Sequence, residues 1–177
     1  MITAVLIEKG PVYPKMVLDR LDTGFFNEVI IMSNCPSIYQ RYLLAAQARN
    51  ETIYVQDSDC LVNYQVLYSH YNEQITNSMT IPFWEKYKEM GCTLVGWGCF
   101  FPKTMLQAFD KYTSVYGMDA HLFREADRIF TYLNKPFNTI IMPHEDILQD
   151  EDRMSSPKNV NFHFASAAEA LRKCSLL

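Results

Sequence analysis

Short apolar runs alternate with longer amphipathic stretches through the first third of the chain. Residues 3–7 and 28–32 are almost continuously apolar, which is typical of strands that are covered on both faces of a sheet. Residues 52–57 are rich in β-branched and aromatic side chains and form a third expected strand. Helices are predicted between these strands over residues 14–21 and 38–48. Because connections of this length are crossovers and not hairpins, the pattern predicts a parallel sheet.

Beyond the third strand the pattern continues with helices and fewer strands. Residues 61–80 are polar and rich in tyrosine, and no regular element is expected there. The later elements are predicted in this order: a helix over residues 82–90, a strand over 92–95, a helix over 102–111, a helix over 120–133, a strand over 139–142 and a closing helix over 165–173. We therefore expect one domain over residues 1–177, a three-layer α/β/α sandwich with a mostly parallel central sheet.

The helix over residues 120–133 has the clearest amphipathic pattern. Leu122 and Ile129 belong to its apolar stripe, which we expect to be buried. Its charged side chains are expected to form the solvated face, and they are Glu125, Asp127 and Arg128. Helix starts are also indicated, because Ser37 precedes the helix over residues 38–48 and Asp119 precedes this one, and both residue types are favoured N-caps.

Composition narrows the classes of function. The chain has 177 residues, 49% of them hydrophobic and 20% charged, which is ordinary for a globular protein. Its net charge of −4 gives no general attraction for nucleic acid. The five cysteines form no CxxC pair, so we expect reduced thiols and a cytoplasmic protein. No long apolar run predicts a membrane span, and the first residues are typical of a strand and not of a signal peptide.

The third strand ends in Asp57-Ser58-Asp59, the stretch that carries the most chemistry. If strand geometry persists, Asp57 and Asp59 lie on the same side, where two ionised carboxylates repel each other. A hard divalent cation such as Mg²⁺ or Mn²⁺ relieves that repulsion. The alternative is a loop in which one aspartate caps the next helix and the other lies in solvent.

Polar side chains also follow the first two strands. Lys9 comes after the first, and Ser33 and Asn34 come after the second. Ligands of parallel α/β sheets bind at the carboxyl ends of the strands. We therefore expect these residues to lie near the Asp57-Ser58-Asp59 stretch, with Ser33 and Asn34 placed to hydrogen-bond a base or a ribose.

With these elements in place, the chain resembles a small GT-A-type glycosyltransferase of the nucleotide-diphospho-sugar transferase superfamily. The resemblance covers most of the chain and includes a DxD motif at residues 57–59. The stretches that carry it are residues 4–9 with 28–34, residues 41–59, residues 95–103 and residues 116–119. It implies a GT-A fold and the transfer of a sugar from a UDP- or GDP-sugar to an acceptor hydroxyl. The chain is short for the family, so activity could require a partner subunit or a second copy of the chain.

The resemblance also implies roles for single residues. Asp57 and Asp59 would hold Mn²⁺ or Mg²⁺, and a late histidine would be the third ligand, either His144 or His163. Asp119 would lie near the acceptor and could be its general base, unless it is only the N-cap of the following helix.

Other residues are assigned to the donor. Arg41 could reach a phosphate, and Arg153 lies in a polar loop that could fold over the diphosphate. Ser58 lies between the two acids and is assigned to donor binding. Trp97 stands between Gly96 and Gly98, and we expect either a flat platform beside a sugar or base, or a turn with a core tryptophan.

The pattern also fits other classes of protein. A phosphohydrolase of the haloacid dehalogenase type has an Asp-x-Asp at a strand end as well, with the first aspartate as nucleophile. Its motif usually follows the first strand, however, and here two strands come earlier. A nucleotide-sugar-binding module without transfer activity would share the same stretches, and so would a structural subunit in which the acids only cap a helix. The sugar, base, acceptor and stereochemical outcome are not indicated by the sequence.

Overall fold

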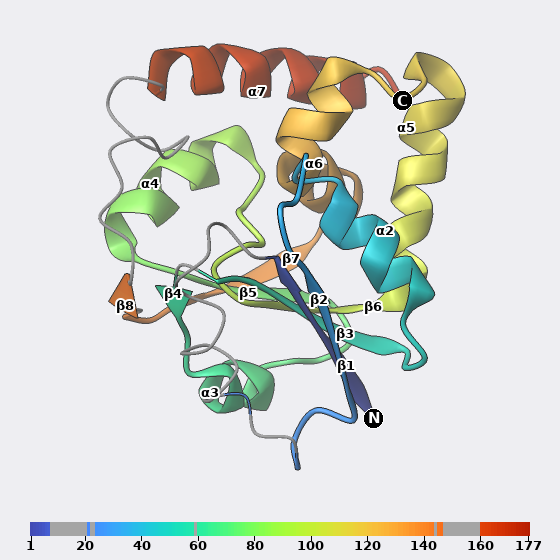
Figure 1. Cartoon of the computed structure of the whole chain (residues 1–177). Coiled ribbons are helices and arrows are strands. Elements are labelled where there is room, and N and C mark those ends of the chain that lie inside the picture. Colours follow the sequence, from blue (N-terminus) through green and yellow to red (C-terminus); the bar gives the residue numbers. More distant parts are fainter. Residues whose placement is uncertain (8–20, 22–23, 59, 144, 147–159) are drawn as a thin grey trace.

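A computed structural model gives the fold of the chain. It describes residues 1–7, 21, 24–58, 60–143, 145–146 and 160–177 (Figure 1). The helix predicted over residues 14–21 and the loop predicted before the closing helix lie almost entirely outside the described residues.

A six-stranded sheet forms the centre of the molecule, with the strand order β2-β1-β3-β6-β5-β7. β1 is parallel to β2 and β3, β5 is parallel to β7, and β6 runs antiparallel between β3 and β5. The strands are β1 (Ile2–Ile7), β2 (Glu28–Met32), β3 (Thr52–Asp57), β5 (Ile75–Met79), β6 (Cys99–Pro102) and β7 (Phe137–Ile141). A separate pair joins β4 (Cys60–Leu61) to β8 (Glu145–Asp146). The predicted mostly parallel sheet is confirmed.

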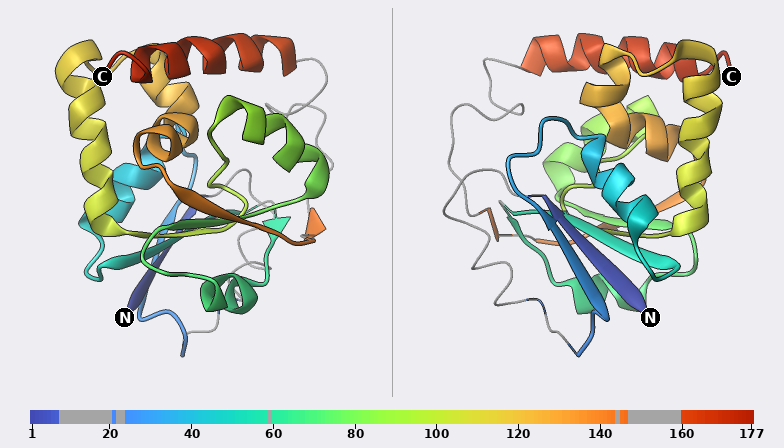
Figure 2. Two further views of the ribbon diagram at one scale, coloured as in Figure 1. Left: turned by 180° about the vertical axis from the view of Figure 1, so that it is seen from behind. Right: turned by 45° about the vertical axis from the view of Figure 1, so that its right-hand side comes forward.

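Helices cover both faces of this sheet (Figures 1 and 2). α3 lies on one face, and α2, α4, α5, α6 and α7 lie on the other. The helices are α2 (Gln40–Gln47), α3 (Tyr64–Ser69), α4 (Ile81–Met90), α5 (Ala108–Tyr116), α6 (Ala120–Leu133) and α7 (Val160–Cys174), with a 3₁₀ helix over Lys103–Gln107 before α5. The arrangement is the expected α/β/α sandwich. Among the described residues, no helix combines the length and the apolar character that a membrane crossing requires.

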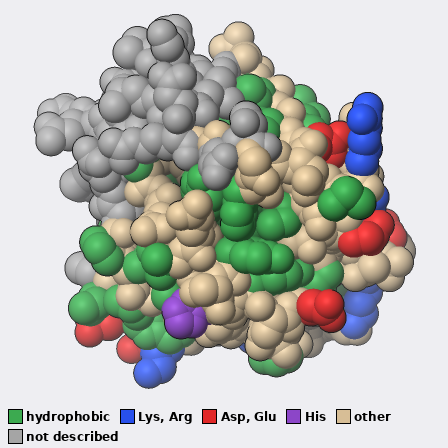
Figure 3. Space-filling model, turned by 90° about the horizontal axis from the view of Figure 1, so that it is seen from below, with side chains coloured by type: hydrophobic (Ala, Val, Ile, Leu, Met, Phe, Trp, Pro, Cys, Tyr) green, Lys and Arg blue, Asp and Glu red, His purple; other side chains and the backbone are tan. Residues whose placement is uncertain are grey.

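Each face of the sheet has its own apolar core. One cluster, which includes Val5, Val55 and Phe101, packs beneath α2, α5 and α6. The other, which includes Tyr54 and Phe100, packs on the α3 side. Seen from that side, apolar side chains gather in the middle of the surface and charged side chains lie toward its margins (Figure 3).

The first two strands differ in burial, although both were predicted to be covered on both faces. β1 is buried along its whole length, as predicted. β2 is only half-buried, and Ile31 is exposed, because β2 is the edge strand of the sheet. The prediction of a helix N-cap at Ser37 was also wrong. α2 begins at Gln40, and its N-cap is Tyr39, whose side chain makes no capping hydrogen bond.

The strand predicted over residues 92–95 does not form, and β6 begins at Cys99 instead. The reason is visible in the hydrogen bonds of the earlier segment. Thr93 N–H donates to Thr131 Oγ1 at 3.0 Å and Val95 N–H donates to Asp127 Oδ2 at 3.2 Å, so two backbone donors are taken by side chains of α6.

Both α3 and β5 lie in the stretch for which no element was predicted, and β5 is the more unexpected of the two. Its five residues are all buried although three of them are polar. Asn77 explains how this is tolerated, because its Nδ2 donates to Thr93 Oγ1 at 2.7 Å and its Oδ1 accepts from Thr139 Oγ1 at 2.8 Å. A polar strand can be buried when neighbouring elements satisfy its side chains.

Candidate functional site

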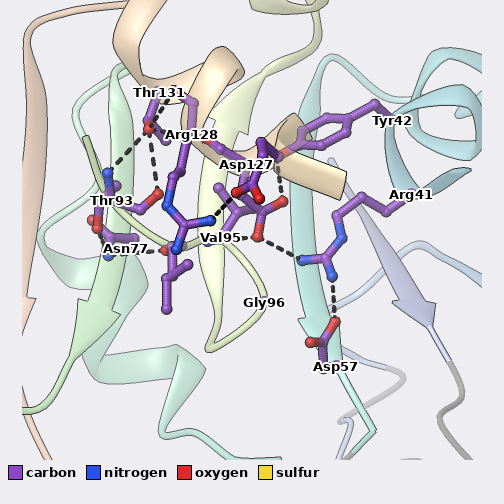
Figure 4. Close-up of polar contacts among 12 residues, drawn as sticks. Arg41, Tyr42, Asp57, Asn77, Thr93, Val95, Gly96, Asp127, Arg128 and Thr131 are labelled. Atoms are coloured by element: carbon purple, nitrogen blue, oxygen red, sulfur yellow. Dashed lines mark hydrogen bonds and ion pairs between the residues drawn. The ribbon is translucent and has the colours of Figure 1, made fainter. Parts of the chain in front are cut away.

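Asp57 and Arg41 form a buried ion pair at the carboxyl end of β3. Arg41 Nη2 donates to Asp57 Oδ1 at 2.6 Å, and the side chains are only 2% and 8% exposed. Figure 4 shows the guanidinium directed from α2 toward the end of β3. An isolated buried carboxylate is unfavourable, and a paired one is tolerated when its partner is close and well oriented. For Asp57, Arg41 thus supplies one counter-charge from within the chain.

Arg41 also faces a second acid, Asp127 of α6. Its Nη1 lies 3.4 Å from Asp127 Oδ2, so one guanidinium stands between two carboxylates (Figure 4). Burial lowers the pKa of Arg41, but the charges of Asp127 and Asp57 outweigh this effect and raise it above the ordinary value. Arg41 therefore remains a cation in the folded protein.

Asp127 is itself fixed by two further donors. Tyr42 Oη donates to Asp127 Oδ1 at 2.7 Å, and Val95 N–H donates to Oδ2. Burial, followed by the neighbouring Asp127 charge, raises the pKa of Tyr42 well above its ordinary value, so the phenol stays protonated and can donate. These bonds hold the Asp127 carboxylate in one orientation beside Arg41.

The prediction that the charged side chains of α6 form a solvated face was wrong. Glu125, Asp127 and Arg128 are 1%, 6% and 1% exposed. The helix is kinked at Glu125, where φ is −115° and ψ is 22°. Glu125 and Arg128 form their own ion pair, and Arg128 Nη2 donates to Tyr87 Oη at 2.7 Å. Burial of this charged side is tolerated because Asp127 pairs with Arg41 of α2 and Glu125 pairs with Arg128 of α6 itself.

Gly96 allows the loop before β6 to approach this cluster. Asp57 N–H donates to Gly96 O at 2.7 Å. A Cβ at position 96 would lie 2.5 Å from Asp57 Oδ2 and 2.9 Å from Arg41 Nη1, both too close for a real contact. Gly98 has a φ of +92°, which few other residues adopt. The tight backbone that was predicted from these two glycines is therefore present, and Gly96 lies against the ion pair.

Trp97 takes part in packing. Its ring meets the ring of Phe83 edge to face at 4.6 Å, and the side chain is partly buried against the apolar cluster beneath α4. Its carbonyl accepts a hydrogen bond from Ser78 Oγ. These are the contacts of a core tryptophan, one of the two roles expected from the sequence, and a role as a donor platform stays a prediction.

A pocket of about 220 Å³ lies beside the cluster, at the carboxyl end of β1 and the start of the segment that leads into α2. Arg41 is one of its lining residues, so this side chain contacts both the pocket and Asp57. The lining residues are Ile7, Cys35, Pro36, Ser37, Ile38, Arg41, Phe123 and Arg124.

Three residues assigned to the donor lie near this edge of the sheet. Ser33 and Asn34 are exposed directly after β2, and Asn34 has a φ of +53°, so the chain turns sharply there toward the pocket-lining residues. Ser58 is buried, and its N–H donates to Ile7 O at 3.0 Å, which continues the pairing of β3 with β1. Their roles toward a donor stay predictions.

Asp119 is the N-cap of α6. Its Oδ1 accepts from Leu122 N–H at 2.8 Å, and its Oδ2 accepts from Lys173 Nζ at 2.6 Å. Burial raises the pKa of Asp119, but the hydrogen bonds from Lys173 and Leu122 outweigh it and leave the pKa below its ordinary value of 3.8. Among the described residues, the contacts of Asp119 come from α5, α6 and α7. The expected N-cap is confirmed, and a role as general base stays a prediction.

Four further candidates lie outside the described residues: Lys9, Asp59, His144 and Arg153. His163 belongs to α7, and its side chain is likewise outside the described part. Asp57 offers carboxylate oxygens, the kind of ligand that Mg²⁺ and Mn²⁺ take, next to a guanidinium that already holds one of them. No cluster of three or more His, Cys, Asp or Glu side chains suited to a metal occurs in the described part of the chain. The metal site therefore stays a prediction.

Comparison with known proteins supports the fold. No model of a protein family matches the chain, and no curated protein sequence matches it. The protein Aq1419 from Aquifex aeolicus VF5 superposes with a TM-score of 0.51 at 13% identity over 80% of this chain and 86% of that one. Two structures are less similar: a glycosyltransferase involved in the glycosylation of the major capsid of PBCV-1 and A197 from STIV.

The glycosyltransferase has a TM-score of 0.48 at 14% identity over 99% of both chains. A197 has a TM-score of 0.38 at 14% identity over 60% of this chain and 68% of that one. These two values are too low for a conclusion about this chain. The fold and the site thus define an α/β protein with a mostly parallel sheet, whose carboxyl edge carries a buried arginine–carboxylate cluster beside a pocket.

Proposed function

We propose that the chain is a metal-dependent glycosyltransferase, which moves a sugar from a nucleotide-diphosphate sugar to an acceptor hydroxyl. The observation that carries the proposal is the position of Asp57. It ends a central parallel strand, beside a pocket at the end of the neighbouring strand β1. In open α/β sheets, this crevice at the carboxyl ends of the strands is where ligands bind.

The pocket suits one part of such a donor. Its volume of about 220 Å³ is smaller than the roughly 300–1,000 Å³ of pockets that enclose a drug-sized ligand. Apolar side chains such as Ile7, Ile38 and Phe123 line it together with two arginines. A flat base would fill it, with Ser33 and Asn34 near the ribose, and the diphosphate would then extend along the strand ends toward Asp57.

Asp57 and Asp59 are proposed to hold the Mn²⁺ or Mg²⁺, with His144 as third ligand. A divalent ion there neutralises the charge that develops on the leaving diphosphate. Arg41 holds one oxygen of Asp57 and so limits the directions in which the carboxylate can face. Lys9 and Arg153 are proposed to contact the phosphates, and Ser58 the donor.

A binding module without transfer activity is the second candidate, and Asp119 favours it. A general base has to accept a proton, and a carboxylate with a lowered pKa accepts one poorly. As a base, Asp119 would also have to release the contacts that it makes with Lys173 or Leu122. A phosphohydrolase with Asp57 as nucleophile fits less well, because the motif of that class usually follows the first strand, whereas β1 and β2 both precede β3 in this chain.

Thermal unfolding in the presence of nucleotides tests the proposal. UDP, GDP and their sugars are each added with Mn²⁺, with Mg²⁺ and with a chelator, since a ligand that binds the folded state raises the unfolding temperature. Stabilisation by one nucleotide only when the cation is present supports both candidates. Slow release of the free sugar from the matching donor then identifies the transferase, and its absence identifies the binding module. If no nucleotide raises the unfolding temperature, the proposed function is wrong.

A further inference from the structure

Three charged groups from distant segments of the chain meet at the end of β3. Asp57 comes from the strand, Arg41 from α2 and Asp127 from the second half of α6. The three side chains are 8%, 2% and 8% exposed, and the buried arginine supplies a counter-charge to each of the two acids. Figure 4 shows the guanidinium lying between the two carboxylates.

The hydrogen bonds and ion pairs link Asp127 to Asp57 through Arg41. Tyr42 Oη and Val95 N–H fix the Asp127 carboxylate. Asp127 then faces Nη1 of Arg41, while Nη2 of the same guanidinium holds Asp57 Oδ1. A guanidinium is planar and rigid, so a group that fixes one of its nitrogens also fixes the direction of the others.

We propose that Asp127 is a positioning residue for the site at Asp57: through Arg41 it sets the direction of the Asp57 carboxylate, and hence the affinity for the divalent cation and the nucleotide. This inference rests on the proposed function. Asp127 does not touch the ligands in this scheme and acts only through the arginine. Residues that orient a ligating carboxylate typically change metal affinity by about 10–100-fold when they are replaced.

The second ion pair of α6 provides a matched comparison. Glu125 and Arg128 are as deeply buried as Asp127, and they lie on the same helix. Arg128, however, donates to Tyr87 of α4. A change at Glu125 therefore disturbs a buried ion pair of α6 whose arginine is Arg128, whereas Asp57 is held by Arg41.

Binding measurements on four proteins test the inference. The wild type, Asp127→Asn, Tyr42→Phe and Glu125→Gln are compared for the dissociation constants of Mn²⁺ and of the nucleotide that stabilises the wild type. We expect Asp127→Asn to weaken Mn²⁺ binding by about 10–100-fold, Tyr42→Phe to weaken it less and Glu125→Gln to leave it unchanged. Tyr42→Phe removes a single hydroxyl and keeps the test open if Asp127→Asn does not fold.

Urea unfolding provides a second test that needs no ligand. The variants Asp57→Asn and Asp127→Asn are measured singly and together. We expect the double variant to lower the unfolding midpoint by more than the sum of the single effects, because Arg41 then remains buried without either counter-charge.

The outcomes separate the two proposals. If the wild type binds no nucleotide with any cation, the proposed function is wrong, whatever the unfolding data show. If the wild type binds but Asp127→Asn and Glu125→Gln behave alike, Asp127 does not position the site. Additive unfolding effects would contradict the link through Arg41 itself.

Discussion

Arg41 Nη2 lies 2.6 Å from Asp57 Oδ1 in a part of the molecule that solvent hardly reaches. The sequence suggested that two neighbouring acids require an external cation, and for Asp57 the chain contributes a guanidinium of its own. Sixteen residues separate Arg41 from Asp57, and the crossover from α2 to β3 brings the two together. The pair changes what substitutions at this site are expected to do.

Replacing Asp57 with alanine is expected to destabilise the fold and not only the site. Removal of one partner leaves the buried Arg41 without its closest counter-charge. Breaking a buried ion pair in this way costs about 3–5 kcal/mol of unfolding free energy. Urea unfolding measures this loss, and Asp110→Ala, which removes an exposed acid of α5, is the control with little expected effect. Equal stabilities of the two variants would show that the pair contributes nothing.

An alanine at position 96 is expected to disturb the ion pair by collision. The added Cβ would lie 2.5 Å from Asp57 Oδ2, so the loop or the carboxylate has to move. Overpacking of this kind typically costs about 1–3 kcal/mol. We expect Gly96→Ala to lower both the urea midpoint and the affinity for the nucleotide.

Gly117→Ala is the control for that substitution. Its Cβ would meet no atom within 4 Å, but the backbone has a φ of +66°, which disfavours alanine. It should lower stability by about 1–3 kcal/mol through backbone strain alone and leave nucleotide binding intact. Normal binding by Gly96→Ala would indicate that the contact with Asp57 is unimportant for the ligand.

The Asp119 carboxyl is expected to make the stability of the fold depend on pH. Its pKa is lower in the folded protein than its ordinary value of 3.8, so the unfolded chain takes up the proton first on acidification. The charge therefore stabilises the fold above about pH 4, and this contribution is lost as the pH falls through the folded pKa. Asp119→Asn, which keeps an oxygen for the cap, should be less stable than the wild type at pH 7 and should approach it in acid.

The same variant distinguishes the two roles of Asp119. A general base contributes about 10²–10⁴-fold to a rate, whereas a cap affects mainly stability. If transfer activity is detected, a turnover number that survives in Asp119→Asn at a temperature where the variant is folded would exclude the base. Loss of turnover with unchanged donor affinity would instead support it.

Cys35 is expected to report on the pocket. It lines the pocket and is half-buried, whereas Cys60, Cys92, Cys99 and Cys174 are buried. Burial raises the pKa of Cys92 to about 11 and that of Cys174 to about 12, so both are poor nucleophiles at neutral pH. Iodoacetamide should therefore modify Cys35 first, as followed by peptide mass spectrometry. Nucleotide with Mn²⁺ should slow this reaction, and an unchanged rate with a bound nucleotide would place the ligand elsewhere.

The pattern of apolar residues predicted the elements best where burial follows side-chain type. β3 was found from its β-branched and aromatic residues, and the bounds of α6 agree with the predicted helix. β5 was missed, because Asn77 and its neighbours are polar and their partners come from distant segments. Partners of that kind do not leave a local signal in the sequence.

The candidate site shows the same limit more sharply. Asp57 was singled out from its place after an apolar strand, but Asp127 was assigned to a solvated face because charged residues on a helix usually lie there. Its partner Arg41 lies 86 residues away in the chain. Only the packing of α6 over α2 reveals that the two charges neutralise each other. The fold class was thus predictable from local patterns, whereas the buried network was not.

Binding of a nucleotide sugar to Asp59→Ala tests the central claim most directly. Calorimetric titrations compare the wild type, Asp59→Ala and the control Asp110→Ala, each with Mn²⁺ and with a chelator. If the two acids after β3 hold a cation that in turn holds a diphosphate, the wild type and the control bind only with Mn²⁺, and Asp59→Ala does not bind. Equal affinity in all three proteins, with or without the cation, would contradict this.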